Sequence, residues 1–159
     1  MSSQVPADVA VAAAVRRLLL ARGETVGCAE SLTGGELAAT LSGPAGSSDT
    51  FVGGVVSYAS EVKRNVLGVT AVQVVSAECA VQMAVGVRDL LGVDWALSTT
   101  GVAGPTRQEG QPVGTVHLGI AGPSGARSVQ LALEGDRSSI RRAACAGALY
   151  LLFTELDDG

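Results

Sequence analysis

Ser31 and Lys63 are the residues of this sequence best suited to chemistry. Ser31 follows a short apolar run and precedes two nearby glycines, and Lys63 is the only lysine in a chain with ten arginines. Arginine stays protonated in proteins, whereas a desolvated lysine can lose its proton and act as a base. A serine nucleophile with a lysine base is a variant of the catalytic triad. The pair therefore predicts nucleophilic attack by Ser31, with Lys63 as the proton acceptor.

Plainer alternatives stay open for these residues and their neighbours. Tyr58 can relay a proton or orient the amine, or it is an ordinary strand aromatic. His117, the only histidine, alternates with apolar residues in a predicted strand, so we expect it to be packed or solvated rather than to be the base. Ser31 or Thr33 is alternatively a helix N-cap, and Lys63 a surface lysine retained by chance.

A shaped loop and two arginines are the candidates for holding an anion. The segment 99–114, TTGVAGPTRQEGQPVG, is too long for a plain turn and matches neither a P-loop nor a dinucleotide fingerprint. Its backbone N–H groups can bind phosphate. Arg137 and Arg141 lie four residues apart on one face of a predicted helix, where two guanidinium groups can fork onto phosphate oxygens. The alternative is a solvated helix face.

Composition limits the class of protein. The 159 residues suit one domain, 1–159, with an ordered core of about 7–156 and loosely held ends at 1–6 and 155–159. A net charge of −4 argues against a nucleic-acid partner, and no apolar run reaches the roughly 18 residues of a membrane span. Charges interrupt the N-terminal apolar run, which predicts a cytoplasmic protein. We expect buried core thiols at the three cysteines, and neither a metal nor another cofactor.

The predicted elements alternate between helices and apolar strands and end in a hairpin and a long helix. This order predicts an α/β fold, specifically a three-layer α/β/α sandwich with a mixed, mostly parallel sheet. Ligands bind beyond the carboxyl ends of such strands, which is where Ser31 falls. The expected helices are 7–22, 33–41, 60–67, 77–91 with Ser76 as its N-cap, and 137–156 with Asp136 as its N-cap. The expected strands are 25–30, 51–59, 95–100, 113–121 and 126–134.

Six segments, read in order, resemble the C-terminal domain of the competence/damage-inducible protein family. That domain also occurs alone as nicotinamide mononucleotide amidohydrolase. The resemblance spans about 110 residues of this chain. The matching segments are AESLTGG (29–35), GPAGSS (43–48), FVGGVVSYASEVK (51–63), TGVAGP (100–105), PVGTV (112–116) and GDRSSIRR (135–142).

The resemblance implies an α/β/α sandwich that hydrolyses nicotinamide mononucleotide to nicotinic acid mononucleotide and ammonia. It implies catalytic roles for Ser31, Tyr58 and Lys63. Together with the residue analysis it gives a set of substrate-binding candidates. They are Thr33, Gly34, Gly35, Ser48, Thr100, Gly101, Gly104, Arg137 and Arg141. We expect a nucleotide substrate, a cytoplasmic homo-oligomer, and no nucleic-acid or membrane partner.

One departure and two rival functions remain. After Gly104 and Pro105 the family usually has an acidic residue and glycines, whereas this chain has Thr106, Arg107 and Gln108. The larger family proteins carry an N-terminal pyrophosphatase domain, so we expect this chain to lack that activity. The rivals are a non-catalytic nucleotide-binding module and a serine amidase, esterase or peptidase of other specificity.

Overall fold

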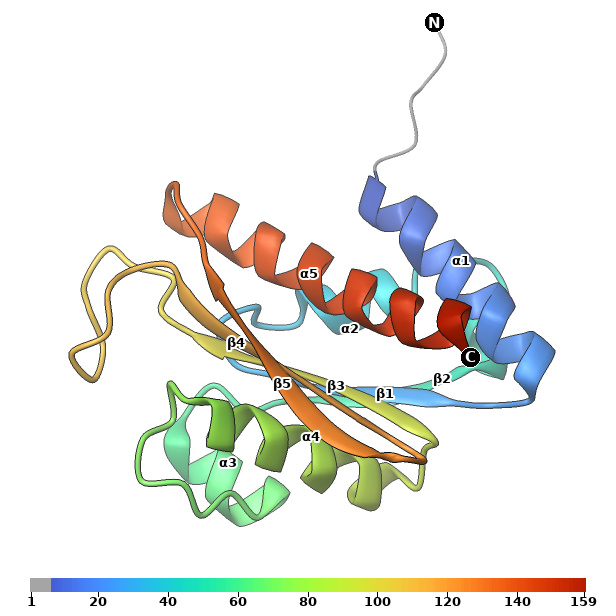
Figure 1. The fold of residues 1–159 in the computed structure, drawn as a ribbon, viewed down its shortest axis with the longest axis horizontal. Coiled ribbons are helices and arrows are strands. Elements are labelled where there is room, and N and C mark those ends of the chain that lie inside the picture. Colours follow the sequence, from blue (N-terminus) through green and yellow to red (C-terminus); the bar gives the residue numbers. More distant parts are fainter. Residues whose placement is uncertain (1–6) are drawn as a thin grey trace, which may run out of the picture.

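A computed structural model describes residues 7–159, and at its centre lies a five-stranded sheet with helices on both faces (Figure 1). One face is covered by α1 (Ala7–Arg22), α2 (Glu36–Leu41) and α5 (Arg137–Asp158). The other face is covered by α3 (Ser60–Leu67) and α4 (Ala77–Leu91). The predicted three-layer α/β/α sandwich is therefore confirmed.

The strands follow the order β2-β1-β3-β4-β5 across the sheet. Strand β1 pairs in parallel with β2 and β3, whereas β4 is antiparallel to both of its neighbours. Only β4 is therefore reversed, as expected for a mixed, mostly parallel sheet. The strands are β1 (Val26–Glu30), β2 (Phe51–Val56), β3 (Trp95–Gly101), β4 (Thr115–Gly122) and β5 (Gly125–Ala132), and a short 3₁₀ helix, η1 (Ser47–Asp49), precedes β2.

The helix caps follow from the sequence. The Ser76 hydroxyl accepts a hydrogen bond from the Cys79 amide at 3.1 Å, and the Asp136 carboxylate accepts one from the Ser139 amide at 2.8 Å. Each side chain satisfies an amide that the first turn of a helix leaves free. Both predicted N-caps are confirmed, and both helices begin at the residue after the cap.

The observed elements differ from the predicted ones in their bounds. The strand expected over 51–59 ends at Val56, and the strand expected from residue 113 begins at Thr115. The helix expected from residue 33 begins only at Glu36, because Gly34 and Gly35 have φ of 55° and 112° and keep the chain in a turn. Residues 155–158, expected to be loose, instead continue α5 to Asp158. The other end expected to be loose, 1–6, lies outside the described residues.

Apolar side chains form one cluster on each side of the sheet. One cluster lies between the sheet and α1, α2 and α5, and the other lies under α3 and α4. Cys28, Cys79 and Cys145 are free and buried, as expected for core thiols. No helix within residues 7–159 combines the length and the apolar character that crossing a bilayer requires.

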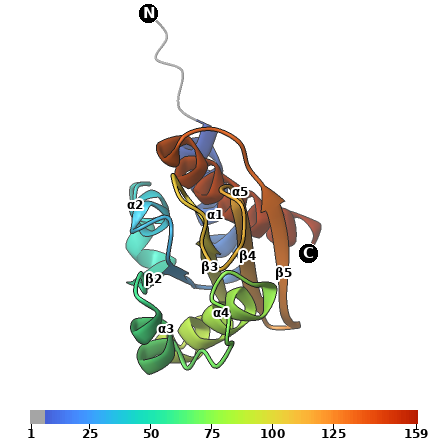
Figure 2. The same cartoon turned by 90° about the vertical axis from the view of Figure 1, so that its left-hand side faces the viewer.

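The carboxyl ends of β1, β2 and β3 meet at one end of the molecule. The loop 102–114 between β3 and β4 lies at the same end, together with the first turn of α5 (Figure 1). Figure 2 looks onto this end, with β2 at one edge of the sheet and β5 at the other. The fold thus brings the segments that follow β1, β2 and β3 and the start of α5 to a common place, whereas 43–48 lies at the amino end of β2.

Candidate active site

Ser31 and Lys63 lie in direct contact. Ser31 follows the carboxyl end of β1, and Lys63 projects from α3. The Lys63 Nζ lies 2.9 Å from the Ser31 Oγ. The same nitrogen donates to the backbone carbonyls of Ser57, at 2.7 Å, and Tyr58, at 3.1 Å. The lysine side chain is thereby fixed against the serine by the backbone that links β2 to α3.

Burial shapes the acid–base behaviour of Lys63, which is only 1% exposed. Desolvation lowers the pKa of Lys63 from its ordinary value of 10.5, because a charged amine is disfavoured away from water. Cys79 and Glu109 raise this pKa by a smaller amount. Among residues 7–159, no carboxylate forms an ion pair with the amine. The shift is in the direction that a general base requires at neutral pH.

A cavity of about 340 Å³ opens beside Ser31, within the range of small-molecule sites. Its walls come from the ends of β1 and β3, the loop after β3 and the start of α5. The lining contains two arginines and no carboxylate. The lining residues are Ser31, Leu32, Tyr58, Gly101, Val102, Ala103, Gly104, Thr106, Arg107, Gln108 and Arg137.

Tyr58 and Arg137 meet at the cavity wall. The Arg137 guanidinium donates to the Tyr58 hydroxyl at 2.9 Å and to the Gly104 carbonyl at 2.6 Å. Tyr58 is 58% exposed, and its carbonyl rather than its hydroxyl contacts the lysine amine. The backbone carbonyl of Tyr58 therefore helps to orient the Lys63 amine, which is one of the two roles expected for this residue. A proton relay through its hydroxyl stays a prediction.

Arg141 supports the turn after Ser31 and does not line the cavity. Its Nε donates to the Leu32 carbonyl at 2.8 Å, and a terminal nitrogen donates to the Thr33 carbonyl at 3.4 Å. Gly34 has φ of 55°, and a Cβ there would lie 2.8 Å from the same guanidinium. Arg141 and Gly34, both candidates for substrate contact, thus shape the turn that carries the free amide of Thr33. Contact of these residues with substrate stays a prediction.

Glu30 occupies the N-terminus of α2, a role that the sequence analysis missed. Its carboxylate is fully buried and accepts hydrogen bonds from the amides of Leu37, at 2.8 Å, and Ala38, at 3.0 Å. Because Glu30 already binds these two amides, they are not free to bind an anion. A charged residue at the end of a wholly buried strand was the available signal.

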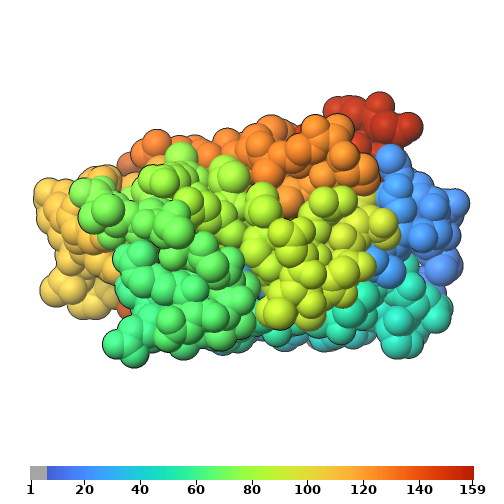
Figure 3. Space-filling model, turned by 90° about the horizontal axis from the view of Figure 1, so that it is seen from below, coloured from blue at the N-terminus to red at the C-terminus, as the bar shows by residue number. Residues whose placement is uncertain are grey.

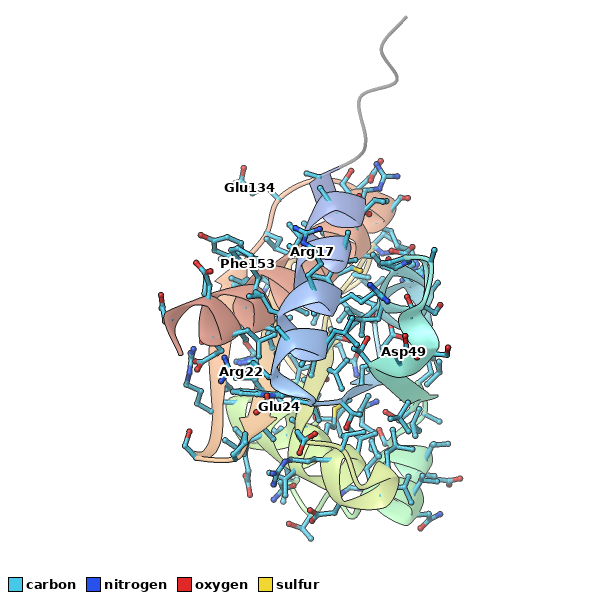
Figure 4. The ribbon with its side chains drawn as sticks, turned by 90° about the vertical axis from the view of Figure 1, so that its right-hand side faces the viewer. Arg17, Arg22, Glu24, Asp49, Glu134 and Phe153 are labelled. Carbon is cyan, nitrogen blue, oxygen red and sulfur yellow. The ribbon has the colours of Figure 1, made fainter. Side chains whose placement is uncertain are left out.

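Other predicted residues lie outside the cavity lining. Thr100 is buried, and its hydroxyl donates to the Val74 carbonyl at 2.6 Å. Ser48 is exposed in η1, which precedes β2 and so lies at the amino ends of the parallel strands, opposite to Ser31. Figure 4 looks at that opposite end, where Asp49 of η1 is labelled. The structure does not bring Ser48 to the cavity of its own chain.

His117 is buried in β4, opposite Thr100, and does not line the cavity. Burial lowers its pKa from 6.5. The prediction that it is packed is confirmed. Gly35 is the N-cap residue of α2, and Gly101 and Gly104 line the cavity.

Residues 8–156 match the family model described as the CinA C-terminal domain. The chain belongs to the CinA C-terminal domain family. A CinA-like protein of Frankia casuarinae is 48% identical over 151 residues, which cover 92% of this chain and 35% of the relative. A CinA-like protein of Synechocystis is 47% identical over 133 residues, covering 80% of this chain and 32% of the relative. The CinA domain described here thus spans about a third of the length of these curated relatives.

Solved CinA structures share the whole fold. A CinA superfamily protein from Klebsiella pneumoniae superposes with a TM-score of 0.92 at 34% identity, covering 97% of this chain and all of the other (100%). The competence/damage-inducible protein CihA of Agrobacterium tumefaciens gives 0.89 at 34% identity, covering 98% and 99%. The α/β architecture is therefore that of the CinA superfamily.

Proposed function

We propose that this CinA domain is an amidohydrolase that converts nicotinamide mononucleotide to nicotinic acid mononucleotide and ammonia, with Ser31 as nucleophile and Lys63 as general base. The observation that carries the proposal is the surroundings of the lysine amine. A neutral amine has two N–H groups and one lone pair. The carbonyls of Ser57 and Tyr58 only accept hydrogen bonds, so they take the two N–H groups, and the lone pair is left for the Ser31 hydroxyl.

The reaction then proceeds in two steps with one acyl-enzyme. Lys63 takes the Ser31 proton as the oxygen forms a bond to the carboxamide carbon. The C–N bond breaks, and ammonia leaves with the proton that Lys63 returns. Water then attacks the ester carbonyl and Lys63 takes one of its protons. The C–O bond to Ser31 breaks, Lys63 returns the proton to the serine oxygen, and the carboxylic acid product loses its remaining proton to solvent to become the carboxylate.

Backbone amides after Ser31 are the proposed donors to the oxyanion. The amides of Ser31 and Gly34 are already bound to the carbonyls of Thr99 and Ser31. The amides of Leu32 and Thr33 have no hydrogen-bond partner among residues 7–159. The amide that follows a serine nucleophile commonly forms an oxyanion hole, and each such donor is worth about 10²–10³ in rate.

The cavity supports a substrate that combines a flat cation with an anion. The exposed ring of Tyr58 gives the pyridinium an aromatic wall. Arg107 and Arg137, with no carboxylate in the lining, make the site electropositive in a chain of net charge −4. The positive charge on the pyridinium stays within the substrate and makes its amide more electrophilic.

Ammonia release from nicotinamide mononucleotide, nicotinamide riboside and nicotinamide tests the proposal. We expect release from the mononucleotide, far less from the riboside and the least from nicotinamide. A non-catalytic module releases none from any of them, and a general amidase acts without the phosphate. Either result would overturn the proposal. A Ser31→Ala preparation is the control for contaminating amidases.

A further inference from the structure

Arg107 is a cation at the cavity for which the catalytic proposal has no specific task. It lies in the loop 102–114, at one of the positions where the chain departs from the family pattern. It lines the cavity, yet its side chain makes no hydrogen bond or ion pair within residues 7–159. Arg137, the other lining arginine, already donates to the Gly104 carbonyl and the Tyr58 hydroxyl. Of the two lining arginines, Arg107 is thus the one whose side-chain donors are free within residues 7–159.

A strained residue fixes the loop that carries Arg107. Glu109 has φ of 52°, in the left-handed region that residues with a Cβ rarely occupy. Its two carboxylate oxygens accept hydrogen bonds from the amides of Val75, at 2.6 Å, and Val74, at 3.1 Å. The side chains of both valines are buried, so their amides need a partner. Strain of this kind persists only where the surroundings impose it.

The hydrogen bonds of the Glu109 carboxylate join the loop after β3 to the segment between α3 and α4. Figure 3 shows the loop after β3, in gold, lying against the green segment that precedes α4. A turn closed by the Gln111 amide on the Gln108 carbonyl, at 2.8 Å, completes the loop tip. Arg107 therefore lies two residues before Glu109, whose carboxylate is held by two amides. Its neighbours Thr106 and Gln108 also line the cavity.

We propose that Arg107 is the specificity-determining residue that binds the phosphate of the mononucleotide, and that Glu109 is the positioning residue that holds its loop. The inference rests on the proposed function and refines its choice of substrate. A guanidinium with free donors suits a phosphomonoester, which presents two or three oxygens. The uncharged riboside offers nothing for it to bind.

Kinetics of matched variants on the mononucleotide and the riboside test this. Arg107→Gln should lower kcat/KM for the mononucleotide about 10–150-fold, the range of a lost charge-assisted hydrogen bond, and leave the riboside unchanged. The control is Arg17→Gln, an exposed arginine of α1 that is labelled in Figure 4 at the other end of the molecule. It should change neither rate. Equal losses on both substrates, or no loss, would overturn the role of Arg107.

Glu109 is tested through its dependence on Arg107. Glu109→Gln should raise KM for the mononucleotide and leave the riboside KM unchanged. Both are measured on the pH plateau, because loss of the Glu109 charge also lowers the pKa of Lys63. The double variant should be no worse than Arg107→Gln alone, because the two changes remove one contact. Additive losses would show that Glu109 does not act through Arg107 and would overturn its positioning role.

Binding of inorganic phosphate separates this inference from the catalytic proposal. Calorimetric titration should give weaker binding to Arg107→Gln than to the wild type and to Arg17→Gln. If no ammonia is released from any substrate but phosphate binding still depends on Arg107, the anion site stands and the amidohydrolase proposal fails. If ammonia is released while phosphate binds Arg107→Gln and wild type equally, the inference fails alone.

Discussion

The Lys63 amine and the Ser31 hydroxyl lie 2.9 Å apart. Lys63 is part of α3, whereas the chain after Ser31 enters α2, and these two helices lie on opposite faces of the sheet. The turn after Ser31 leads into α2, which packs on the α1 and α5 side, whereas Lys63 belongs to α3 on the α4 side. The two side chains meet because both lie at the carboxyl ends of neighbouring parallel strands. The pairing of Glu30 with Val56 sets that register.

Ser31→Ala should abolish ammonia release and retain substrate binding. The hydroxyl is the only group lost, and the serine makes no side-chain hydrogen bond other than that with Lys63 within residues 7–159. Isothermal titration with nicotinamide mononucleotide should give a dissociation constant close to the KM of the wild type. A wild-type rate in this variant would end the assignment of the nucleophile.

Lys63→Arg should lose nearly as much activity as Lys63→Ala. If the lysine must accept a proton, arginine does not replace it, and the loss should be about 10²–10⁴ in kcat. The larger guanidinium in so buried a position is a steric confounder, so the binding constant is measured beside the rate. If Lys63→Arg keeps most of the wild-type kcat and binds the substrate as the wild type does, Lys63 is not the general base and its role is electrostatic.

The pH dependence follows from the lowered pKa of Lys63. Activity requires the neutral amine, so kcat/KM should rise with pH through an ionisation below 10.5 and then level off. The profile is measured with the mononucleotide in constant-ionic-strength buffers. A rate that is flat with pH, or falls across this range, contradicts a general-base lysine.

Stability gives the same test without turnover. Because the folded pKa lies below the unfolded value of 10.5, the unfolded chain binds the extra proton between these two values. The contribution of the neutral amine to the free energy of unfolding is complete above pH 10.5. It is lost as the pH falls toward the pKa of Lys63 in the folded protein. The free energy of unfolding of the wild type minus that of Lys63→Met should therefore increase from pH 7 to pH 10 in urea titrations. Both chains contain the same buried thiols, so their titration cancels in this difference to a first approximation.

The layers and most elements were predictable because they depend on local patterns. Residues 7–22 are rich in good helix formers, and 26–30 form a wholly buried strand, so each segment specified its own structure. Ser31 and Tyr58 became candidates because they follow the ends of predicted strands, and Lys63 because it is the only lysine of the chain.

Sequence spacing did not predict which candidate residues line the cavity and which support the backbone around it. Arg137 and Arg141 share a helix face, yet one lines the cavity and the other binds the Leu32 carbonyl, because the turn after β1 lies under the second turn of α5. Glu109 was also missed, since its partners at 74–75 are 34–35 residues away along the chain.

Glu30→Gln should lower the free energy of unfolding by about 1.5–3 kcal/mol, the worth of a hydrogen bond to a charged group. The amide side chain keeps one acceptor for the two α2 amides that Glu30 now satisfies. Urea unfolding measures the loss. The control is Glu36→Gln, an exposed carboxylate in the same helix, which should change stability by no more than about 0.5 kcal/mol. Equal effects of the two variants would show that Glu30 does not cap α2.

Arg137→Gln and Arg141→Gln should fail in different ways. Arg137 lines the cavity, so its loss should raise KM for the mononucleotide about tenfold or more and leave kcat nearly intact. Arg141 holds the carbonyls of Leu32 and Thr33, so its loss should displace the turn that carries the oxyanion donors. It should therefore lower kcat for the mononucleotide and the riboside alike, and lower the melting temperature.

Steady-state kinetics on both substrates, with thermal unfolding of each variant, separate the two patterns. If Arg141→Gln instead raised only the KM of the mononucleotide, Arg141 would bind phosphate and the scaffold role assigned to it would be wrong.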